Sequence, residues 1–202
     1  RLAKALSHIE RSLVKNVHNI KARGLKAYLL RKLGRTKEAA AWIQENLALD
    51  PFDFLSGNEQ VLLAEAAGGT DSEAKAEMRN GVEFSTAAEL RIALNEKMRD
   101  FPDNYLMTAR DYAEFGGFEE AASLLNACTK EQPMLYYYEA YYRSCLGEDV
   151  SGLLRKAEET APDYCFPNEL EDIGVLSFAI DHGCTAKAPY YLGCLFYDKL
   201  QW

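Results

Sequence analysis

A tyrosine-rich stretch offers the clearest recognition chemistry in this sequence. The segment MLYYYEAYYRSC, residues 134–145, holds five tyrosines. At 3.6 residues per helical turn, Tyr137 and Tyr141 share one face. A surface that mixes tyrosine with arginine can bind an acidic peptide or a C-terminal carboxylate through charge-assisted hydrogen bonds, or it can stack a sugar ring. The alternative is that these tyrosines fill the space between helices while their hydroxyls reach water.

Catalytic chemistry is not indicated by the sequence. Carboxylates are abundant, as in ELEDIG (169–174) and FEEA (118–121), but acid–base catalysis needs two of them at a defined separation, which the sequence does not show. Gly68-Gly69 lacks the strand context and the lysine of a phosphate-binding loop. No base adjoins Cys165, so a buried structural cysteine is the preferred interpretation of its thiol. We expect no catalytic residue and no cofactor in this segment.

Cysteine and histidine content argue against a metal site. The five cysteines lack CxxC spacing, and the three histidines fit no zinc-ligand pattern. We therefore expect no metal and no disulfide framework, which indicates a reducing compartment and a cytoplasmic location. No apolar run approaches the roughly 20 residues that cross a bilayer, and the N-terminus lacks the layout of a signal peptide, so no membrane contact is expected.

Charge is distributed unevenly along the chain. The formal net charge is −8, yet residues 1–50 carry 11 Lys or Arg against 4 acidic residues, a net of +7. The remaining residues carry 12 basic against 27 acidic side chains, a net of −15. An acidic field repels phosphate backbones and no nucleic-acid motif is present, so we expect no nucleic-acid partner. Most of these charges are interpreted as solvated helix faces.

A repeat is visible at an offset of 34 residues. KALSHIERSLVKNV (4–17) aligns with EAAAWIQENLALDP (38–51), with apolar residues at helical spacing in both. In a second comparison, 25–51 with 106–133, a helix ends at Gly34 or Gly116, Glu-Ala follows at four and five residues, and proline falls seventeen after the glycine. Glycine accepts the left-handed conformation that ends a helix, alanine lets two helices approach to about 8–10 Å, and proline cannot continue the second helix.

Residues 19–51 and 104–133 resemble tetratricopeptide repeats, and 3–17 resembles the second helix of an earlier repeat. The resemblance extends to a small residue seven before each turn glycine, namely Ala27, Ala109 and Ala140. It departs at Arg23, where the family usually places a large apolar residue. The resemblance implies an all-α fold, a right-handed α-α superhelix in which helical hairpins stack as a tetratricopeptide-like solenoid.

We predict a single helical repeat domain over residues 1–202 that is a fragment of a longer chain. In the irregular repeat, residues 72–79 are a candidate short helix and Ser85 a candidate N-cap. The predicted parts are the second helix of a repeat (3–17), a repeat (19–51), an irregular repeat (52–102) with an insertion (68–84), a repeat (104–133), a shortened repeat (134–162), a helical stretch (164–185) and the first helix of a truncated repeat (186–202).

The resemblance also implies a ligand groove. In tetratricopeptide arrays the first helices line a concave groove, and the positions ten and six before the turn glycine face it. Gly24, Leu106 and Cys194 occupy such positions without a recognition group of their own. The candidate ligand-binding residues are Tyr28, Arg31, Lys32, Arg110, Tyr137, Tyr141 and Tyr190, of which Arg31 and Lys32 add positive charge beside the groove.

The last part of the chain resembles a wider group of proteins. Residues 159–202, through PDYCFP (162–167), LEDIGVL (170–176) and APYYLGCLFYDK (188–199), are similar to the C-terminal repeat region of large bacterial proteins. In those proteins a domain of unknown function, related to carbohydrate-processing β-sandwich enzymes, precedes tetratricopeptide repeats. This implies a non-catalytic scaffold that binds a protein, a peptide or another domain of its own chain, with an oligomer left open. The alternative is an accessory region that contributes to glycan binding or hydrolysis.

Overall fold

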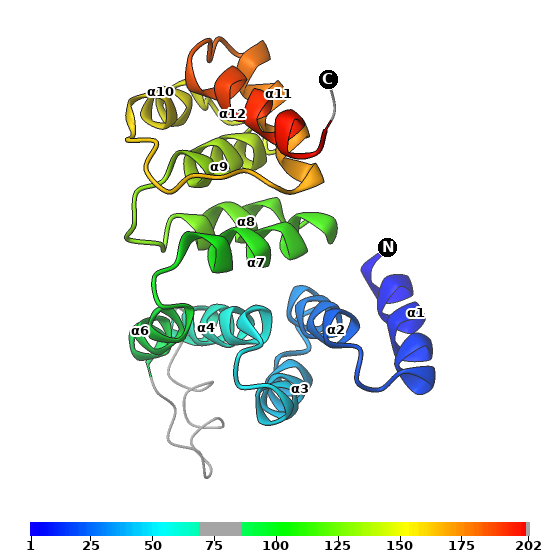
Figure 1. Cartoon of the computed structure of the whole chain (residues 1–202). Coiled ribbons are helices and arrows are strands. Elements are labelled where there is room, and N and C mark those ends of the chain that lie inside the picture. Colours follow the sequence, from blue (N-terminus) through cyan, green and yellow to red (C-terminus); the bar gives the residue numbers. More distant parts are fainter. Residues whose placement is uncertain (69–85, 201–202) are drawn as a thin grey trace. The chain divides into compact units, whose positions relative to one another are not determined.

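The computed structural model describes residues 1–68 and 86–200, which form α-helices joined by turns and loops (Figure 1). They belong to two compact units, unit 1 (Arg1–Arg99) and unit 2 (Asp100–Trp202). Unit 1 contains α1 (Leu2–Lys15), α2 (Ile20–Lys32), α3 (Thr36–Leu49), α4 (Phe54–Gly68) and α6 (Ala87–Met98). Unit 2 contains α7 (Pro102–Glu114), α8 (Phe118–Leu125), α9 (Pro133–Cys145), α10 (Ser151–Glu159), α11 (Leu170–Asp181) and α12 (Lys187–Asp198). The all-α prediction is confirmed for the described residues.

Part of the irregular repeat cannot be compared with the structure. Residues 69–84 of the predicted insertion, the candidate helix at 72–79, the candidate cap Ser85 and the final Gln201-Trp202 lie outside the described residues. The helix that follows the insertion begins at a capping box instead, in which Thr86 accepts a hydrogen bond from the Glu89 amide and the Glu89 carboxylate accepts one from the Thr86 amide.

Helices that follow one another among the described residues pack as hairpins within each unit. In unit 1 these are α2–α3 and α4–α6, with α1 packed on α2; in unit 2 they are α7–α8, α9–α10 and α11–α12. The first helix of a hairpin also lies against the first helix of the hairpin before it, as α4 does on α2, α9 on α7 and α11 on α9. The predicted fold of stacked tetratricopeptide-like hairpins is confirmed inside each unit. Residues 186–202, expected to begin a new repeat, contain α12, which follows α11 as the second helix of its hairpin.

Four glycines end first helices in the same way. Gly34, Gly116 and Gly147 have the positive φ that the sequence predicts, and Gly183 at the end of α11 has it as well, with φ between 72° and 95°. After each glycine, the next amide donates to the carbonyl five residues earlier, as Cys184 does to Ala179 at 3.0 Å. These are the bonds of a Schellman motif, which satisfies carbonyls that the helix end would leave unpaired.

A buried alanine five residues beyond the glycine brings the two helices of a hairpin together. Ala39, Ala121 and Ala188 hold this position after Gly34, Gly116 and Gly183, and all three are fully buried. A methyl group at this point is small enough to let the two helix backbones approach closely, whereas a larger side chain would hold them apart. The same pair of residues therefore builds α2–α3, α7–α8 and α11–α12.

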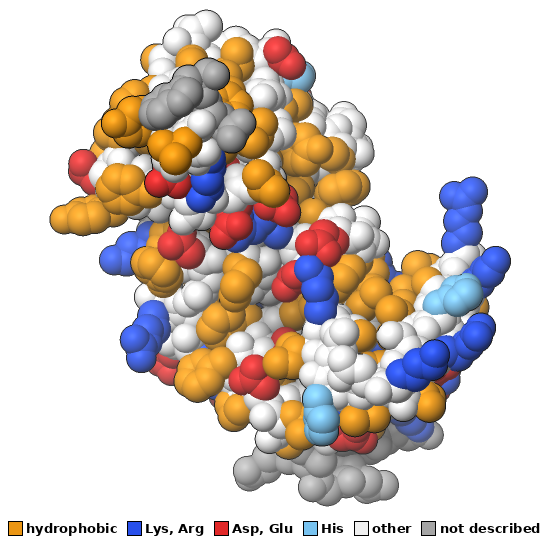
Figure 2. All heavy atoms as spheres, turned by 45° about the vertical axis from the view of Figure 1, so that its right-hand side comes forward, with side chains coloured by type: hydrophobic (Ala, Val, Ile, Leu, Met, Phe, Trp, Pro, Cys, Tyr) orange, Lys and Arg blue, Asp and Glu red, His pale blue; other side chains and the backbone are white. Residues whose placement is uncertain are grey.

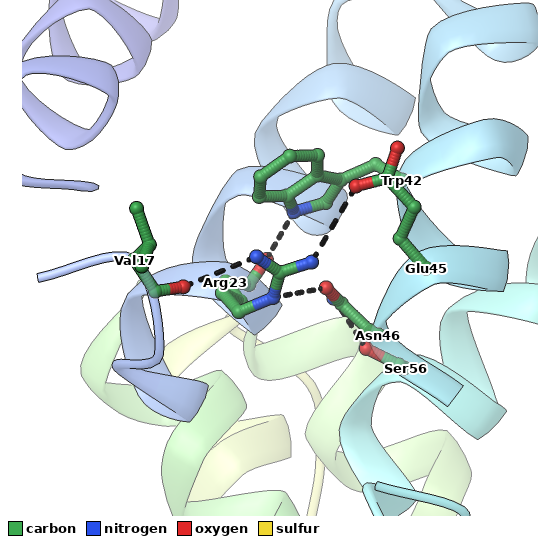
Figure 3. A network of polar contacts seen from close by, with 6 residues as sticks. All are labelled: Val17, Arg23, Trp42, Glu45, Asn46 and Ser56. Atoms are coloured by element: carbon green, nitrogen blue, oxygen red, sulfur yellow. Dashed lines mark hydrogen bonds and ion pairs between the residues drawn. The ribbon is translucent and has the colours of Figure 1, made fainter. Parts of the chain in front are cut away.

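Arg23 replaces the expected apolar residue with a buried polar network in unit 1 (Figure 3). Its Nε donates to Asn46 Oδ1 at 2.7 Å, and Asn46 Nδ2 donates to Ser56 Oγ at 2.9 Å. The Arg23 Nη1 atom donates to the carbonyl of Val17 at 3.1 Å. Because a buried guanidinium is tolerated only when its donors are satisfied, these bonds explain how α2 carries arginine here. One side chain thereby connects α2 with α3, with α4 through Asn46, and with the turn after α1.

Trp42 covers the outer side of this network. Its indole Nε1 donates to the Arg23 carbonyl at 3.0 Å, and the Arg23 guanidinium lies 4.2 Å from the centre of the indole ring. The ammonium of Lys26 lies 3.9 Å from the same ring, and this lysine also pairs with Glu10 at 3.7 Å. Cation–π contacts of this kind stabilise the packing of α2 on α3 beyond the area they bury.

Candidate functional site

Of the three candidate residues of unit 1, Arg31 forms an internal ion pair. Arg31 Nε and Nη2 donate to the two carboxylate oxygens of Glu59 at 2.6 and 3.0 Å, and Glu59 on α4 is fully buried. The ring of Tyr28 is buried beside them, 5.7 Å from the Arg31 guanidinium and 5.6 Å from the Lys32 ammonium. The bidentate geometry commits Arg31 to holding α2 against α4 rather than to a carboxylate from outside.

Arg110 has a comparable position in unit 2. The hydroxyl of Tyr138 on α9 donates to Asp172 Oδ1 at 2.6 Å, while Asp172 Oδ2 accepts from the amides of Asn168 and Glu169 at 2.9 Å each. Burial opposes the charge of Arg110, but the nearby Tyr138 hydroxyl and the carboxylates of Glu169 and Asp172 raise the pKa of the guanidinium. These groups form a row from α7 through α9 to α11, so Arg110 takes part in the packing of three first helices.

Tyr137 is also engaged inside the fold. Its side chain is fully buried, and its hydroxyl donates to Glu158 Oε1 on α10 at 2.5 Å. The Glu158 carboxylate also accepts from the amides of Ala186, Lys187 and Ala188 at 3.1–3.2 Å, which are the first amides of α12. Burial acts to raise the pKa of Glu158, yet the Tyr137 hydroxyl and these amides outweigh it and lower the pKa below its ordinary value. Tyr137 and Glu158 together fasten α10 to the start of α12.

Tyr141 lies half-buried on α9, about one turn after Tyr137. Its ring meets that of Phe178 on α11 edge to face, with the centroids 5.4 Å apart, and Phe178 lies 4.1 Å from the ring of His182. This row of aromatic rings contributes to the contact between two first helices, α9 and α11.

Tyr190 is the candidate residue that opens onto a cleft. The cleft has a volume of about 880 Å³ and lies in unit 2 between the segment 162–169 and the outer side of α12. Cys165, Phe166 and Glu169 line it from the segment, and Tyr190, Tyr191 and Cys194 line it from the helix. The side chains of Phe166 and Tyr190 are 78% and 63% exposed. We call this site the α12 cleft.

The Tyr191 side chain, which lines the α12 cleft, has a buried hydroxyl that forms no hydrogen bond with an oxygen or nitrogen atom of the described residues. Tyr191 is 1% exposed. Burial and the neighbouring Cys165 thiol raise the pKa of this hydroxyl, so it stays neutral across the physiological range. Burial also raises the pKa of the Cys165 thiol, although the Tyr191 hydroxyl acts in the opposite direction.

Both lysines that line the α12 cleft have partners in the fold. Lys187 Nζ donates to the carbonyl of Thr160, and Lys199 Nζ lies 3.1 Å from Asp198 Oδ2. Glu169 projects from the opposite side with a half-exposed carboxylate, 3.9 Å from Arg110 Nη2. The cleft therefore presents aromatic rings, one buried hydroxyl and a carboxylate.

The comparisons with known proteins add a likeness to a solved structure. No family model and no curated protein matches the chain. Among solved structures, the chain is similar to the crystal structure of a thermophilic TPR protein from Thermus thermophilus, with 17% sequence identity and a TM-score of 0.41 over 97% of this chain and 91% of that one. At this TM-score the likeness adds nothing to the fold that the helix pairing itself gives.

The described residues provide neither a membrane-spanning helix nor a cluster of metal ligands. None of the described helices has both the length and the apolar character needed to span a bilayer. Within the same residues, no three histidine, cysteine or acidic side chains lie together as metal ligands would.

Sequence reasoning missed half of the α12 cleft. Phe166, Glu169 and Tyr191 were not singled out as site residues, and α11–α12 was not recognised as a hairpin. The signal was present, because Gly183 is followed by alanine at the fifth position, as Gly34 and Gly116 are. Applying that spacing alone would have placed Tyr190 and Tyr191 on the second helix of a hairpin.

Proposed function

We propose that the chain is a non-catalytic helical scaffold that binds a segment of another protein, or of another domain of its own chain, in the α12 cleft. The observation that carries this proposal is the exposure of Phe166 and Tyr190 on the two sides of one cleft of about 880 Å³. Large aromatic side chains that line a concavity are typical anchors for a partner. Tyr190 thus remains a candidate ligand-binding residue, whereas Arg31, Arg110 and Tyr137 act within the scaffold.

The chemistry of three thiols of unit 2, one of them in the cleft, supports a binding role rather than a catalytic one. A nucleophilic cysteine reacts as the thiolate and requires a lowered pKa. Burial instead raises the pKa of Cys165 in the cleft, of Cys184 to about 11 and of Cys128 to about 12. These sulfur atoms are therefore protonated at neutral pH.

The nature of the partner domain is the less specific part of the proposal. The similarity of residues 159–202 to repeat regions that follow a domain of unknown function, related to carbohydrate-processing β-sandwich enzymes, favours such a domain as the intramolecular partner. A glycan that binds directly to the exposed rings is the rival, since aromatic faces also stack on sugars.

The proposal is tested by selecting peptides from a random display library on the immobilised chain. Selected peptides are labelled, and their Kd is measured by fluorescence anisotropy for the wild type, Tyr190→Ala and Phe52→Ala. Phe52 is the matched control because it is 64% exposed, like Tyr190, but lies in unit 1. A hot-spot aromatic contributes about 2 kcal/mol or more, so Tyr190→Ala should weaken binding roughly 30-fold while Phe52→Ala leaves it unchanged.

Either of two results would overturn the proposal. One is that no peptide is enriched, and the other is that both variants bind the selected peptides as the wild type does. A panel of oligosaccharides is added in parallel, with melting temperature as the readout. A dose-dependent rise that Tyr190→Ala abolishes would favour the glycan alternative, since a ligand of the native state raises stability.

A further inference from the structure

Unit 2 is strongly acidic. Residues 100–202 contain 7 Lys or Arg against 18 Asp or Glu, a net charge of −11. On the face that Figure 2 shows, hydrophobic and acidic side chains of this unit lie together with a few Lys and Arg side chains, and further Lys and Arg side chains project from α1 of unit 1. A surface with this excess of one sign accelerates and favours association with a partner of opposite charge.

Two lysines and two acidic residues, Glu169 and Asp198, line the α12 cleft. The two lysines, Lys187 and Lys199, are held by Thr160 and Asp198. The half-exposed carboxylate of Glu169, on the opposite side of the cleft, lies 3.9 Å from Arg110 Nη2 and also takes part in the capping box at the start of α11. A ligand that enters the cleft therefore meets two lysines that already have partners and the Glu169 carboxylate, which is still half-exposed to solvent.

The buried hydroxyl of Tyr191 lies beside the Cys165 thiol and has no oxygen or nitrogen partner within the described residues. Because a thiol is a weak hydrogen-bonding group, a ligand that brought an N–H to this hydroxyl would improve its hydrogen bonding. The lone pairs of the hydroxyl oxygen can accept from an N–H group.

The exposed rings of Phe166 and Tyr190 are suited to contact a cationic side chain. Phe166 and Tyr190 are exposed aromatic residues at the rim, and an ammonium or guanidinium over the face of such a ring is attracted to its electrons. The aliphatic stems of lysine and arginine also pack on rings while their heads reach polar groups. Aromatic rim, buried acceptor and carboxylate together match a long cationic side chain better than an acidic or a purely apolar one.

We propose that the segment bound in the α12 cleft is basic, with a lysine or arginine whose stem packs on Phe166 and Tyr190, whose head group donates to the Tyr191 hydroxyl, and whose charge is balanced by Glu169. This inference rests on the proposed function, because it specifies the partner of the same cleft.

The test uses three display libraries that differ only at four fixed positions, which carry lysine, glutamate or glutamine. The complete chain is the target, and enrichment is compared among the libraries at low and at physiological ionic strength. We expect the lysine library to be enriched, and the Kd of its selected peptides to rise at least threefold as salt increases.

Two conservative variants with matched controls locate the effect. Glu169→Gln and Tyr191→Phe should each weaken the lysine peptides three- to tenfold. Glu171→Gln and Tyr197→Phe, which alter exposed residues outside the cleft lining, should not. Melting temperatures within 3 °C of the wild type establish that each variant is folded.

The outcomes separate this inference from the proposed function. Preferential enrichment of the glutamate or glutamine library, with loss of binding in Tyr190→Ala, would overturn the basic partner and leave the cleft as a binding site. Enrichment of none of the three libraries would overturn both. Lysine peptides that bind the two cleft variants as tightly as the wild type would show attraction to the acidic surface in general and refute the assignment to this cleft.

Discussion

Removal of Arg31 should reveal how much the buried ion pair contributes to unit 1. The change Arg31→Met keeps a long apolar side chain on α2 but deprives the fully buried Glu59 carboxylate of the counter-charge that it meets at 2.6 and 3.0 Å. Breaking one side of a buried pair costs about 3–5 kcal/mol. Because the Arg31 side chain keeps 16% exposure, we place the loss near the lower end, at about 3 kcal/mol. For a unit of about 100 residues, this corresponds to a fall in Tm of roughly 12–24 °C.

A double-mutant cycle distinguishes the ion pair from simple packing. Urea unfolding followed by circular dichroism at 222 nm gives the free energy of unfolding for the wild type, Arg31→Met, Glu59→Leu and the double variant. The double variant should lie within about 1.5 kcal/mol of the wild type, because apolar replacement of both partners removes the desolvation penalty as well. A loss below 1 kcal/mol in Arg31→Met, or additive losses in the double variant, would refute the view that Arg31 serves the scaffold.

Three further substitutions test other parts of the structure. The pKa of Glu158 is lowered from 4.5, so its stabilising effect is complete above that pH and is lost as the pH falls through the folded-state value; Glu158→Gln should therefore flatten the decline of Tm between pH 5 and 3, and an unchanged slope would contradict this. Gly193→Ala, exposed and in open space within α12, should stabilise by about 0.5–1 kcal/mol in urea unfolding, and a loss would count against its helical environment. Gly24→Ala should destabilise by about 1–3 kcal/mol in spite of the higher helix propensity of alanine, because its Cβ would lie 2.3 Å from Leu55 Cδ2. In a chain that already carries Leu55→Ala, Gly24→Ala should cost less, and an equal cost in both chains would show that the loss does not come from this contact.

The hairpins could largely be predicted because their determinants are local. Gly34, Gly116 and Gly147 adopt the left-handed conformation that their positions predict. Gly183 differs from Gly34 and Gly116 because no proline stands seventeen residues after it, and proline is a dispensable way to stop a second helix. The necessary elements are the glycine, which alone tolerates that φ at little cost, and the alanine that permits close approach.

The side chains of the predicted groove could not be assigned from periodicity. Helical spacing shows which residues share a face but not which charge the neighbouring helix places opposite. Arg31 meets Glu59 and Tyr137 meets Glu158, in each case on the next helix or beyond and more than 20 positions along the chain. Half of the α12 cleft belongs to the segment 162–169, which has no periodic pattern, so only its helical side, at Tyr190, was within reach of sequence reasoning.

The network around Arg23 has a consequence for how this sequence can vary. Arg23, Asn46 and Ser56 satisfy one another in a buried chain of hydrogen bonds, so replacement of any single member strands a polar group away from water. Exchange of the whole set for hydrocarbon side chains of similar bulk would avoid that penalty. Among homologous sequences, positions 23, 46 and 56 should therefore switch in concert between a polar and an apolar state, and chains with an intermediate combination should be rare.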